Sequence, residues 1–326
     1  MDQSILYKSY YYGETIIRRI CMRRSMTIDE WTFALAIYEK FNAKDRYALF
    51  LELLEKKEIN LSNENHHFDA MIENKKIKKL SSKKKASFAC FLKDLDIEKE
   101  MKRYRSKKIQ WKYIYSKDYP ELLSQIYIPP ILLFYQGDYS ILKKPLFLAV
   151  VGARLTTDYG LRLVEELIPS IIEQSKGEIV VVSGLAKGID RKAHEECLKS
   201  KGRTIGVIGS GLDSYYPRGN KKLQKRMARE ELVLSEYPLG SKPLRYHFPE
   251  RNRIIAGLSR GVLVIEAKER SGSLITAYNA LDENRDIFAC PGSLLEKTSE
   301  GCHKLLQNGA YLIRNSEDIL KEWFLI

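Results

Sequence analysis

The sequence has little of what marks a secreted or membrane-spanning protein. Its 326 residues contain only five cysteines, and no two of them form a CxxC pair. An odd number of scattered cysteines in a long chain argues against a disulfide framework. No run of about 18 apolar residues is present, so no helix should span a membrane, and the N-terminus lacks the apolar stretch of a secretory signal. These absences predict a cytoplasmic protein with reduced cysteines.

Motifs for common nucleotide chemistry are missing as well. No GxxxxGK followed by Ser or Thr occurs, so ATP hydrolysis by a P-loop is not supported. The stretch GSGLDS contains Gly209 and Gly211, but Ser214 stands where a dinucleotide-binding GxGxxG needs its third glycine. Ser183 and Ser271 do not lie in the GxSxG turn of a hydrolase nucleophile.

Positive charge is in excess. The chain has 55 Lys and Arg residues against 42 Asp and Glu residues, which gives a formal net charge of +13. This balance favours a polyanion or an anionic membrane surface as the partner, although a basic housekeeping enzyme from an AT-rich genome fits the charge too. Seven lysines lie between residues 75 and 85. They could form a nucleic-acid patch or the solvated face of small helices, and both interpretations stay open.

The chain shows two composition regimes. Residues 1–110 have helical patterns with few Gly or Pro residues, and Thr27 and Glu30 are spaced as a capping box before a helix. Residues 111–145 form a connector with a Pro-Pro break. From residue 146 onward, short β-branched apolar runs alternate with helical segments.

Six of these runs predict the strands of one sheet. Continuous apolar runs of this length indicate strands buried on both faces, and the helices between them indicate right-handed βαβ crossovers. The fold class is therefore α/β, with a doubly wound, mostly parallel sheet. The runs are LFLAVVG (146–152), EIVVVSG (178–184), TIGVIGS (204–210), LVLSEY (232–237), GVLVIEA (261–267) and DIFACPG (286–292).

The segments after these strands share a composition that suits an anion. Nearly every one places Gly, Ser or Thr beside a cation just before a helix, and ligands of such sheets bind beyond the carboxyl ends of the strands. Small residues leave backbone N–H groups accessible, and a helix N-terminus adds positive potential, so phosphate is favoured. One such loop is ordinary, but five at one edge predict an anionic ligand. Their cations are Arg154, Lys187, Arg218, Lys221 and Arg270.

Two groups of side chains are candidates for catalysis. Asp190, His194 and Cys197 share one predicted helix, but no second cluster of metal ligands accompanies them, so we expect the aspartate to position the helix and the others to pack. Glu236 and Glu266 each end a predicted strand. They could be general bases, but pairing with nearby arginines is favoured because a buried carboxylate needs a partner. We therefore expect a binding protein rather than an enzyme, without metal or cofactor.

Six segments, in order, lie within a match that runs from about residue 110 to residue 322. They are VGARLTTDYG, VVSGLAKGIDRKAHEECL, GRTIGVIGSGLDSYYPRGNKKL, LVLSEYPLG, FPERNRIIAGLSRGVLVIEAKERSGSLITAYNA and RDIFACPGSLLEKTSEGCHKLLQNGAYLI. Together they resemble the DNA-processing protein A family, also called DprA or Smf. The resemblance implies an extended Rossmann-like domain over residues 111–326, behind a small helical, basic domain over residues 1–110. It also implies a homodimer that binds single-stranded DNA, protects it and loads the RecA recombinase during natural transformation.

The resemblance also assigns residues. DNA contacts fall on Arg154 and Arg218, their loop neighbours line the same pocket, and Leu306 and Leu312 fall at the dimer interface. The polar residues around the strand at 261–267 form a second wall of that pocket in our interpretation. The full set of candidate DNA-binding residues is Gly152, Arg154, Ser183, Gly184, Lys187, Gly188, Arg218, Asn220, Lys221, Arg251, Asn252, Arg253, Ser271, Gly272, Ser273 and Thr276.

Some positions keep two interpretations. Arg251 and Arg253 could reach DNA, or they could brace the two strand-end glutamates. Tyr215 and Tyr216, beside Arg218, could stack on bases or pack beneath their loop. Because phosphate contacts carry no sequence information, we expect binding that is nearly sequence-independent and strongly salt-dependent.

The sequence departs from the family pattern at both ends. The N-terminal region lacks a helix-hairpin-helix glycine signature, and we expect no winged helix after the final stretch NSEDILKEWFLI. The alternative function is that of a nucleotide-binding or phosphoribohydrolase-type enzyme on a related Rossmann-like fold. Such enzymes carry PGGxGT where this chain has RSGSLIT and CPGS, so DNA binding is favoured.

Overall fold

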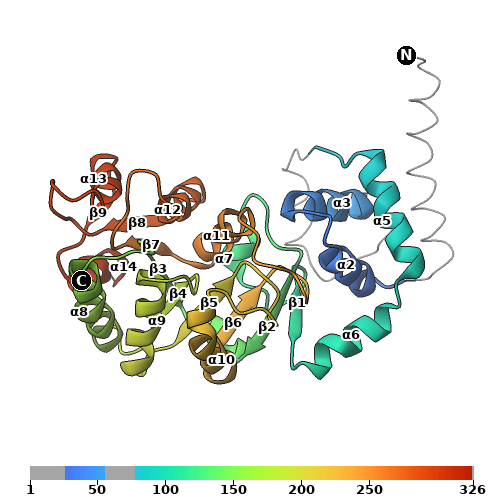
Figure 1. The fold of residues 1–326 in the computed structure, drawn as a ribbon, viewed down its shortest axis with the longest axis horizontal. Helices are drawn as coiled ribbons and strands as arrows, with labels where there is room; N and C mark the ends of the chain where they lie inside the picture. The colour runs from blue at the N-terminus through green and yellow to red at the C-terminus, as the bar shows by residue number, and fades with distance from the viewer. Residues whose placement is uncertain (1–25, 56–77, 325–326) are drawn as a thin grey trace, which may run out of the picture. The chain divides into compact units, whose positions relative to one another are not determined.

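The computed structural model describes residues 26–55 and 78–324, whose elements are labelled in Figure 1. They belong to two compact units. The first unit runs up to residue 119 and includes 127–133, and the second contains 120–126 and everything from 134 onward. Within the described ranges, no helix has both the length and the apolar character needed to cross a membrane.

The first unit is helical. Its capping box is confirmed, because the Thr27 hydroxyl accepts from the Glu30 N–H at 3.2 Å and the Glu30 carboxylate accepts from the Thr27 N–H at 2.7 Å. Aromatic rings such as Phe33 and Phe88 fill its core. The elements are α2 (Ile28–Ile37), α3 (Ala43–Glu55), α5 (Ser82–Asp94), α6 (Ile97–Ser106) and β1 (Gln110–Tyr113).

The lysine-rich block starts outside the described residues and continues into α5. There Lys84 pairs with Asp45 of α3 at 2.6 Å. Lys85 is buried and pairs with Glu52 of α3 at 2.5 Å. These two lysines therefore join two helices, and their charges are engaged within the unit.

The second unit is built on a sheet with the strand order β2-β6-β5-β4-β3-β7-β8-β9. Neighbouring strands are parallel, apart from the antiparallel pair of β2 and β6. All six predicted strands are present, so the predicted α/β class with a mostly parallel sheet is confirmed. The strands are β2 (Leu132–Gly137), β3 (Leu146–Val151), β4 (Ile179–Ser183), β5 (Thr204–Ile208), β6 (Leu232–Ser235), β7 (Gly261–Val264), β8 (Asp286–Ala289) and β9 (Tyr311–Leu312).

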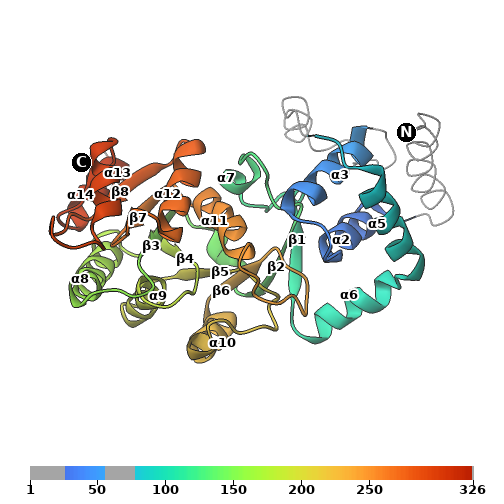
Figure 2. The ribbon, with the colours of Figure 1, turned by 45° about the horizontal axis from the view of Figure 1, so that its top comes forward.

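Helices cover both faces of this sheet, as Figure 1 and Figure 2 show. Helices α8, α9, α10 and α14 pack on one face, and α11 and α12 pack together on the other. Strand and helix side chains such as Leu148, Val181, Ile168 and Trp323 share one apolar cluster. The helices are α7 (Glu121–Ser124), α8 (Asp158–Gln174), α9 (Ile189–Lys199), α10 (Lys221–Glu230), α11 (His247–Leu258), α12 (Gly272–Asp282), α13 (Glu300–Gln307) and α14 (Ser316–Phe324), with 3-10 turns η1 (Tyr139–Lys143) and η2 (Arg218–Asn220).

The strand order places the predicted loops together. From β3 the chain adds β4, β5 and β6 on one side, and it then returns to add β7, β8 and β9 on the other side. Because these strands are parallel, the loops that follow β3, β4 and β5 leave the same edge of the sheet. This edge carries the candidate site.

Candidate nucleic-acid interface

The loops after β3, β4 and β5 are hydrogen bonded to one another. The Ile189 N–H donates to the Ala153 carbonyl at 3.2 Å, which joins the first two loops. Gly188 has a φ of +74°, and a Cβ there would lie 2.2 Å from the Ala153 oxygen, so only glycine fits. The Asn220 amide donates to the carbonyls of Leu185 and Ala186 at 2.8 and 2.9 Å, which joins the third loop. The three loops therefore form one fixed surface.

Four of the predicted cations are exposed on these loops or, in the case of Lys221, at the start of the helix that follows the third loop. They are Arg154, Lys187, Arg218 and Lys221. In the part of the chain that the structure describes, none of the four forms an ion pair. The Arg154 guanidinium lies 5.5 Å from the centre of the Phe248 ring. Their charges are consequently available to an external anion.

Two buried ionisable side chains, those of Asp190 and Arg251, support the loop after β4. Asp190 accepts from the N–H groups of Gly184 and Ala186 at 3.1 and 3.4 Å. Arg251 of α11 donates to the Gly184 carbonyl at 2.8 Å and to the Val207 carbonyl. Burial raises the pKa of Asp190, against the charge of Arg251, and burial lowers the pKa of Arg251 to about 10. Asp190 and Arg251 together hold the backbone of this loop in place through these hydrogen bonds.

Glu236 and Glu266 are both engaged as hydrogen-bond acceptors. Glu236 accepts twice from Arg253, at 2.7 and 2.6 Å, so its expected pairing with an arginine is confirmed. Glu266 differs from expectation, because it accepts from the Thr156 hydroxyl at 2.6 Å and from the Thr157 hydroxyl at 2.5 Å. The hydroxyls of Thr156 and Thr157 are the hydrogen-bond donors to Glu266, in place of the arginine that we expected. The carboxylate thus fixes the loop that carries Arg154.

Several candidate residues have side chains in the interior. The buried Ser183 hydroxyl donates to the Val150 carbonyl at 2.6 Å. Gly152 faces the side chain of Ile189, and a Cβ there would lie 2.6 Å from it. Like Asn220 and Arg251, these residues shape the loops, so any contact that they make with a ligand would come from their backbone.

The candidates at the start of α12 form a second group. The Ser271 and Ser273 hydroxyls are hydrogen bonded to each other at 2.8 Å, and Thr276 is buried. The Asn252 amide donates to the Gly272 carbonyl at 3.1 Å, which ties α12 to α11. Of this group, Gly272 is bordered by open space.

The possible metal ligands on α9 are core residues. His194 Nδ1 is hydrogen bonded to the Thr204 hydroxyl at 2.7 Å, and the Cys197 thiol donates to the Arg203 carbonyl at 3.2 Å. Burial, with a smaller effect of Arg251, lowers the pKa of His194 to about 3. Among the described residues no group of three or more His, Cys, Asp and Glu side chains could hold a metal ion.

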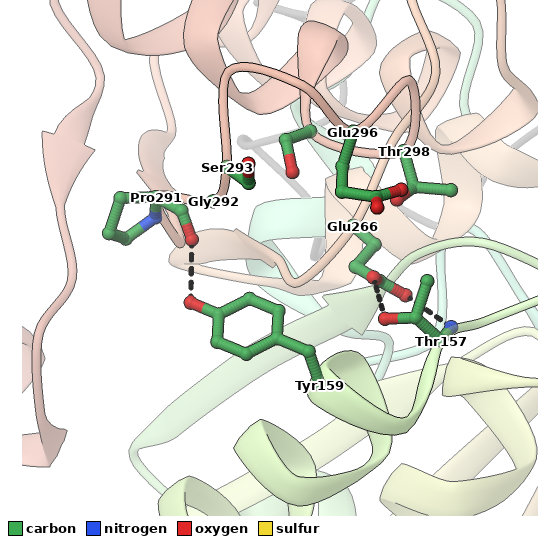
Figure 3. Close-up of a pocket in the computed structure, with 9 residues that line it drawn as sticks. Thr157, Tyr159, Glu266, Pro291, Gly292, Ser293, Glu296 and Thr298 are labelled. Carbon is green, nitrogen blue, oxygen red and sulfur yellow. Dashed lines mark hydrogen bonds between the residues drawn. The ribbon is translucent and has the colours of Figure 1, made fainter.

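A separate cavity of about 500 Å³ lies beyond the ends of β3, β7 and β8 (Figure 3). Its lining includes the carboxylates of Glu266 and Glu296. The Tyr159 hydroxyl donates to the Pro291 carbonyl at its margin, at 2.7 Å. Among the residues that the structure describes, no Lys or Arg side chain is part of this lining. The carboxylates of the cavity would repel a phosphate. The loops with the exposed cations are therefore the better site for an anion.

Phe248 was not predicted as part of the site. It lies in the first turn of α11, and its ring centre is 5.4 Å from that of Tyr216 in the loop after β5. One aromatic residue near a helix start gives no periodic signal, so only the tertiary structure shows the contact. The predicted dimer residues lie elsewhere: Leu306 is half-buried on α13, and Leu312 is exposed on β9, which ends the strand order.

The chain is similar to DNA processing proteins over most of its length. A family model described as DNA recombination-mediator protein A matches residues 110–324. The DNA processing protein DprA of Streptococcus pneumoniae is 53% identical over 205 residues, which cover 63% of this chain and 71% of that protein. DprA of Bacillus subtilis is 48% identical over 219 residues, which cover 67% and 73% of the two chains.

Solved structures give the same result. The X-ray structure of DprA from Streptococcus pneumoniae aligns with a TM-score of 0.75 at 41% identity, and it covers 91% of this chain and 98% of that one. DprA from Helicobacter pylori aligns with a TM-score of 0.58 at 32% identity, over 66% of this chain and 96% of that one. The latter structure is described as showing a single-stranded DNA binding mode.

Proposed function

Because the chain belongs to the DNA recombination-mediator protein A family, also called DprA or Smf, we propose that it binds single-stranded DNA at the loops after β3, β4 and β5. In this proposal it acts in the cytoplasm during natural transformation, protects incoming strands and delivers them to the RecA recombinase. The described DNA-binding mode of the Helicobacter pylori relative supports the ligand class.

The observation that carries the proposal is the set of exposed cations without ion pairs at one sheet edge. Arg154, Lys187, Arg218 and Lys221 sit on loops that are hydrogen bonded to one another and supported from below by Asp190. A fixed cationic surface attracts the phosphates of a strand in any sequence. The buried candidates hold this surface in place, and the exposed ones meet the DNA.

Binding, rather than catalysis, is the activity that we propose for this edge. Two carboxylates could have acted as bases, but both accept hydrogen bonds from the protein. Glu236 accepts from Arg253, and Glu266 accepts from the hydroxyls of Thr156 and Thr157. Because protein donors already occupy these carboxylates, we assign both of them a structural role. The stretch GLSRG at 257–261 has the GxSxG spacing of a nucleophile turn, but its buried serine donates to the Ile255 carbonyl and ends a helix.

The test is fluorescence anisotropy with a labelled single-stranded oligonucleotide. We expect Arg154→Ala and Arg218→Ala each to weaken binding about tenfold or more, because each removes a charged phosphate contact worth roughly 1.5–3 kcal/mol. Arg260→Ala is the matched control. Its guanidinium also lies 5.5 Å from an aromatic ring, Trp323, but it precedes β7 at the opposite edge of the sheet. Wild-type affinity in both loop variants would refute the site.

Delivery to RecA and self-association are further parts of the proposal. The family description as a recombination mediator supports the first, and the exposed Leu312 on an edge strand supports the second. RecA filament formation on single strands should be faster with the protein present. A rate that is the same with and without the protein would contradict delivery.

A further inference from the structure

The cavity in Figure 3 contains a buried carboxylate that is held only by neutral donors. Glu266 follows β7 and is 2% exposed. It accepts from the hydroxyls of Thr156 and Thr157 and from the Thr157 N–H at 3.1 Å. Among the residues that the structure describes, no Lys, Arg or His side chain pairs with Glu266, and none lines the cavity. A buried carboxylate is costly without a counter-ion, so this cavity suits a ligand with a positive charge.

Thr298 adds a second group that suits a ligand. It lines the same cavity, and within the described ranges its buried hydroxyl oxygen has no hydrogen-bond partner. The Ala267 N–H donates to the Thr298 carbonyl at 2.7 Å, which places Thr298 beside the residue that follows Glu266. A buried hydroxyl without a partner is unfavourable, so this oxygen indicates a ligand that supplies a hydrogen-bond donor.

The remaining lining suits a short alkyl chain that carries a second positive charge. The rings of Tyr159 and Pro291 supply apolar surface, and a tyrosine ring also attracts an ammonium group. Glu296 is an exposed residue of the lining and supplies a second carboxylate. The volume of about 500 Å³ lies in the range of small-molecule sites.

The segment 291–299, which forms much of the lining, is fixed by contacts near both ends. The Tyr159 hydroxyl donates to the Pro291 carbonyl at 2.7 Å, and His303 Nε2 is hydrogen bonded to the Gly292 carbonyl at 3.0 Å. A Cβ on Gly292 would lie 2.1 Å from Ser299 Oγ, so the two ends of the segment approach each other closely. The cavity is consequently formed before any ligand arrives, which lowers the cost of binding.

We propose that this cavity binds a small aliphatic diamine or polyamine. One ammonium group lies against Glu266, provides the counter-charge and donates to the Thr298 hydroxyl. The alkyl chain lies along Tyr159, and a second ammonium group pairs with Glu296. A metal ion fits less well, because among the described residues no group of three or more His, Cys, Asp and Glu side chains could hold one.

The overall charge of the chain makes this proposal easy to test. A protein with a formal net charge of +13 repels small cations in general, so saturable binding of a diamine reports a specific site. Isothermal titration calorimetry with putrescine and with spermidine measures it. Two control ligands separate charge from shape: the neutral diol with the same chain length as putrescine, and Mg²⁺, which has the same charge without a chain. We expect one bound putrescine per chain, and much weaker binding of both controls.

Three variants locate the site. Glu266→Gln should weaken putrescine binding about tenfold or more, and Thr298→Val about fivefold, because each removes a hydrogen bond to an ammonium group. Thr298→Val loses a hydroxyl that has no partner in the described structure, so its thermal unfolding should stay at or above that of wild type. Glu300→Gln is the matched control, because Glu300 is an exposed glutamate in the first turn of α13 outside the lining, and it should bind as wild type does.

Each contrary outcome overturns the proposal. Wild type that binds no putrescine refutes the site, and binding of the diol or of Mg²⁺ as tight as that of putrescine refutes the class of ligand. Wild-type affinity in both Glu266→Gln and Thr298→Val would place the diamine elsewhere, even if Glu266→Gln alone were less stable. Single-stranded DNA binding is measured separately, by anisotropy, so the proposed function stands or fails independently of this result.

Discussion

Arg253 of α11, which is partly buried, and Glu236, which is buried after β6, form an ion pair in which one guanidinium nitrogen donates to both carboxylate oxygens at 2.7 and 2.6 Å. Burial opposes the charge of Arg253, but Glu236 outweighs this effect and raises the pKa of the arginine. Among the described residues, two other nitrogens of the guanidinium have no hydrogen-bond partner. Removal of either side chain would leave the other one without its counter-ion. The ion pair also fixes α11 against the sheet.

Glu236→Gln should destabilise the protein strongly. The change leaves Arg253 charged and largely shielded from water without its counter-ion, and breaking a fully buried pair costs about 3–5 kcal/mol, so we expect a loss toward the lower end of that range. Chemical denaturation followed by circular dichroism measures the free energy of unfolding. Arg226→Ala, which breaks the exposed pair with Glu230 on α10, should cause no measurable change. A Glu236→Gln variant as stable as the Arg226→Ala variant would contradict this role.

His194 should make the fold sensitive to acid. Its pKa is lowered to about 3 by burial, whereas an unfolded histidine titrates near 6.5. Above about pH 6.5 both states are neutral, so the histidine does not change stability. As the pH falls from 6.5 toward 3, only the unfolded state takes up the proton, and each pH unit costs up to about 1.4 kcal/mol.

The measurement is the free energy of unfolding from pH 7 to pH 4 for wild type and His194→Asn. The variant lacks this titration, so wild type should lose more stability over this range than the variant loses. Parallel curves would show that His194 is protonated in the folded protein. Carboxylates titrate in both proteins, and the comparison removes their contribution.

Thr157 should be important for the loop that carries Arg154. Its hydroxyl accepts from the Gly160 N–H at 3.2 Å, which caps α8, and it donates to Glu266 at 2.5 Å. Thr157→Val removes both bonds, so we expect a loss of about 1–2 kcal/mol in unfolding free energy and weaker DNA binding. Thr157→Ser keeps the hydroxyl and should stay close to wild type in both assays. Equal behaviour of the two variants would contradict the capping role.

Leu312 should determine self-association. It is 46% exposed on β9, which ends the strand order, and an exposed apolar side chain on an edge strand favours contact with a second copy. In the homodimer that we propose, Leu312→Glu should convert the dimer to a monomer, which sedimentation velocity experiments measure. Leu294→Glu, at another exposed leucine in the loop before α13, should remain a dimer. A dimeric Leu312→Glu variant would place the interface elsewhere.

The sequence predicted those parts of the fold whose own residues determine them. The run LFLAVV of β3 is buried along its whole length, and the spacing of Thr27 and Glu30 fixes the start of α2. By contrast, β9 has two residues and becomes a strand only because β8 lies beside it. Sequence patterns therefore found the central strands and missed those at the edges.

The candidate site was predicted in the same uneven way. The exposed cations could be named because their loops follow recognisable strands. The burial of Arg251 could not be predicted, because Arg251 donates to the backbone carbonyls of Gly184 and Val207, which lie far away in the sequence. The contact between Tyr216 and Phe248 likewise joins two separate segments. Such pairings follow from the packing of α11 against the sheet.

A competition experiment between single-stranded and duplex DNA across a salt series tests the central claim most directly. We predict that single strands compete better at every salt concentration, and that the logarithm of the affinity falls linearly with the logarithm of salt, by about 0.7 for each phosphate contacted. Arg154→Ala should show a shallower slope, while Arg260→Ala should keep the slope of wild type. Equal competition by duplex, or an affinity that does not depend on salt, would contradict the account.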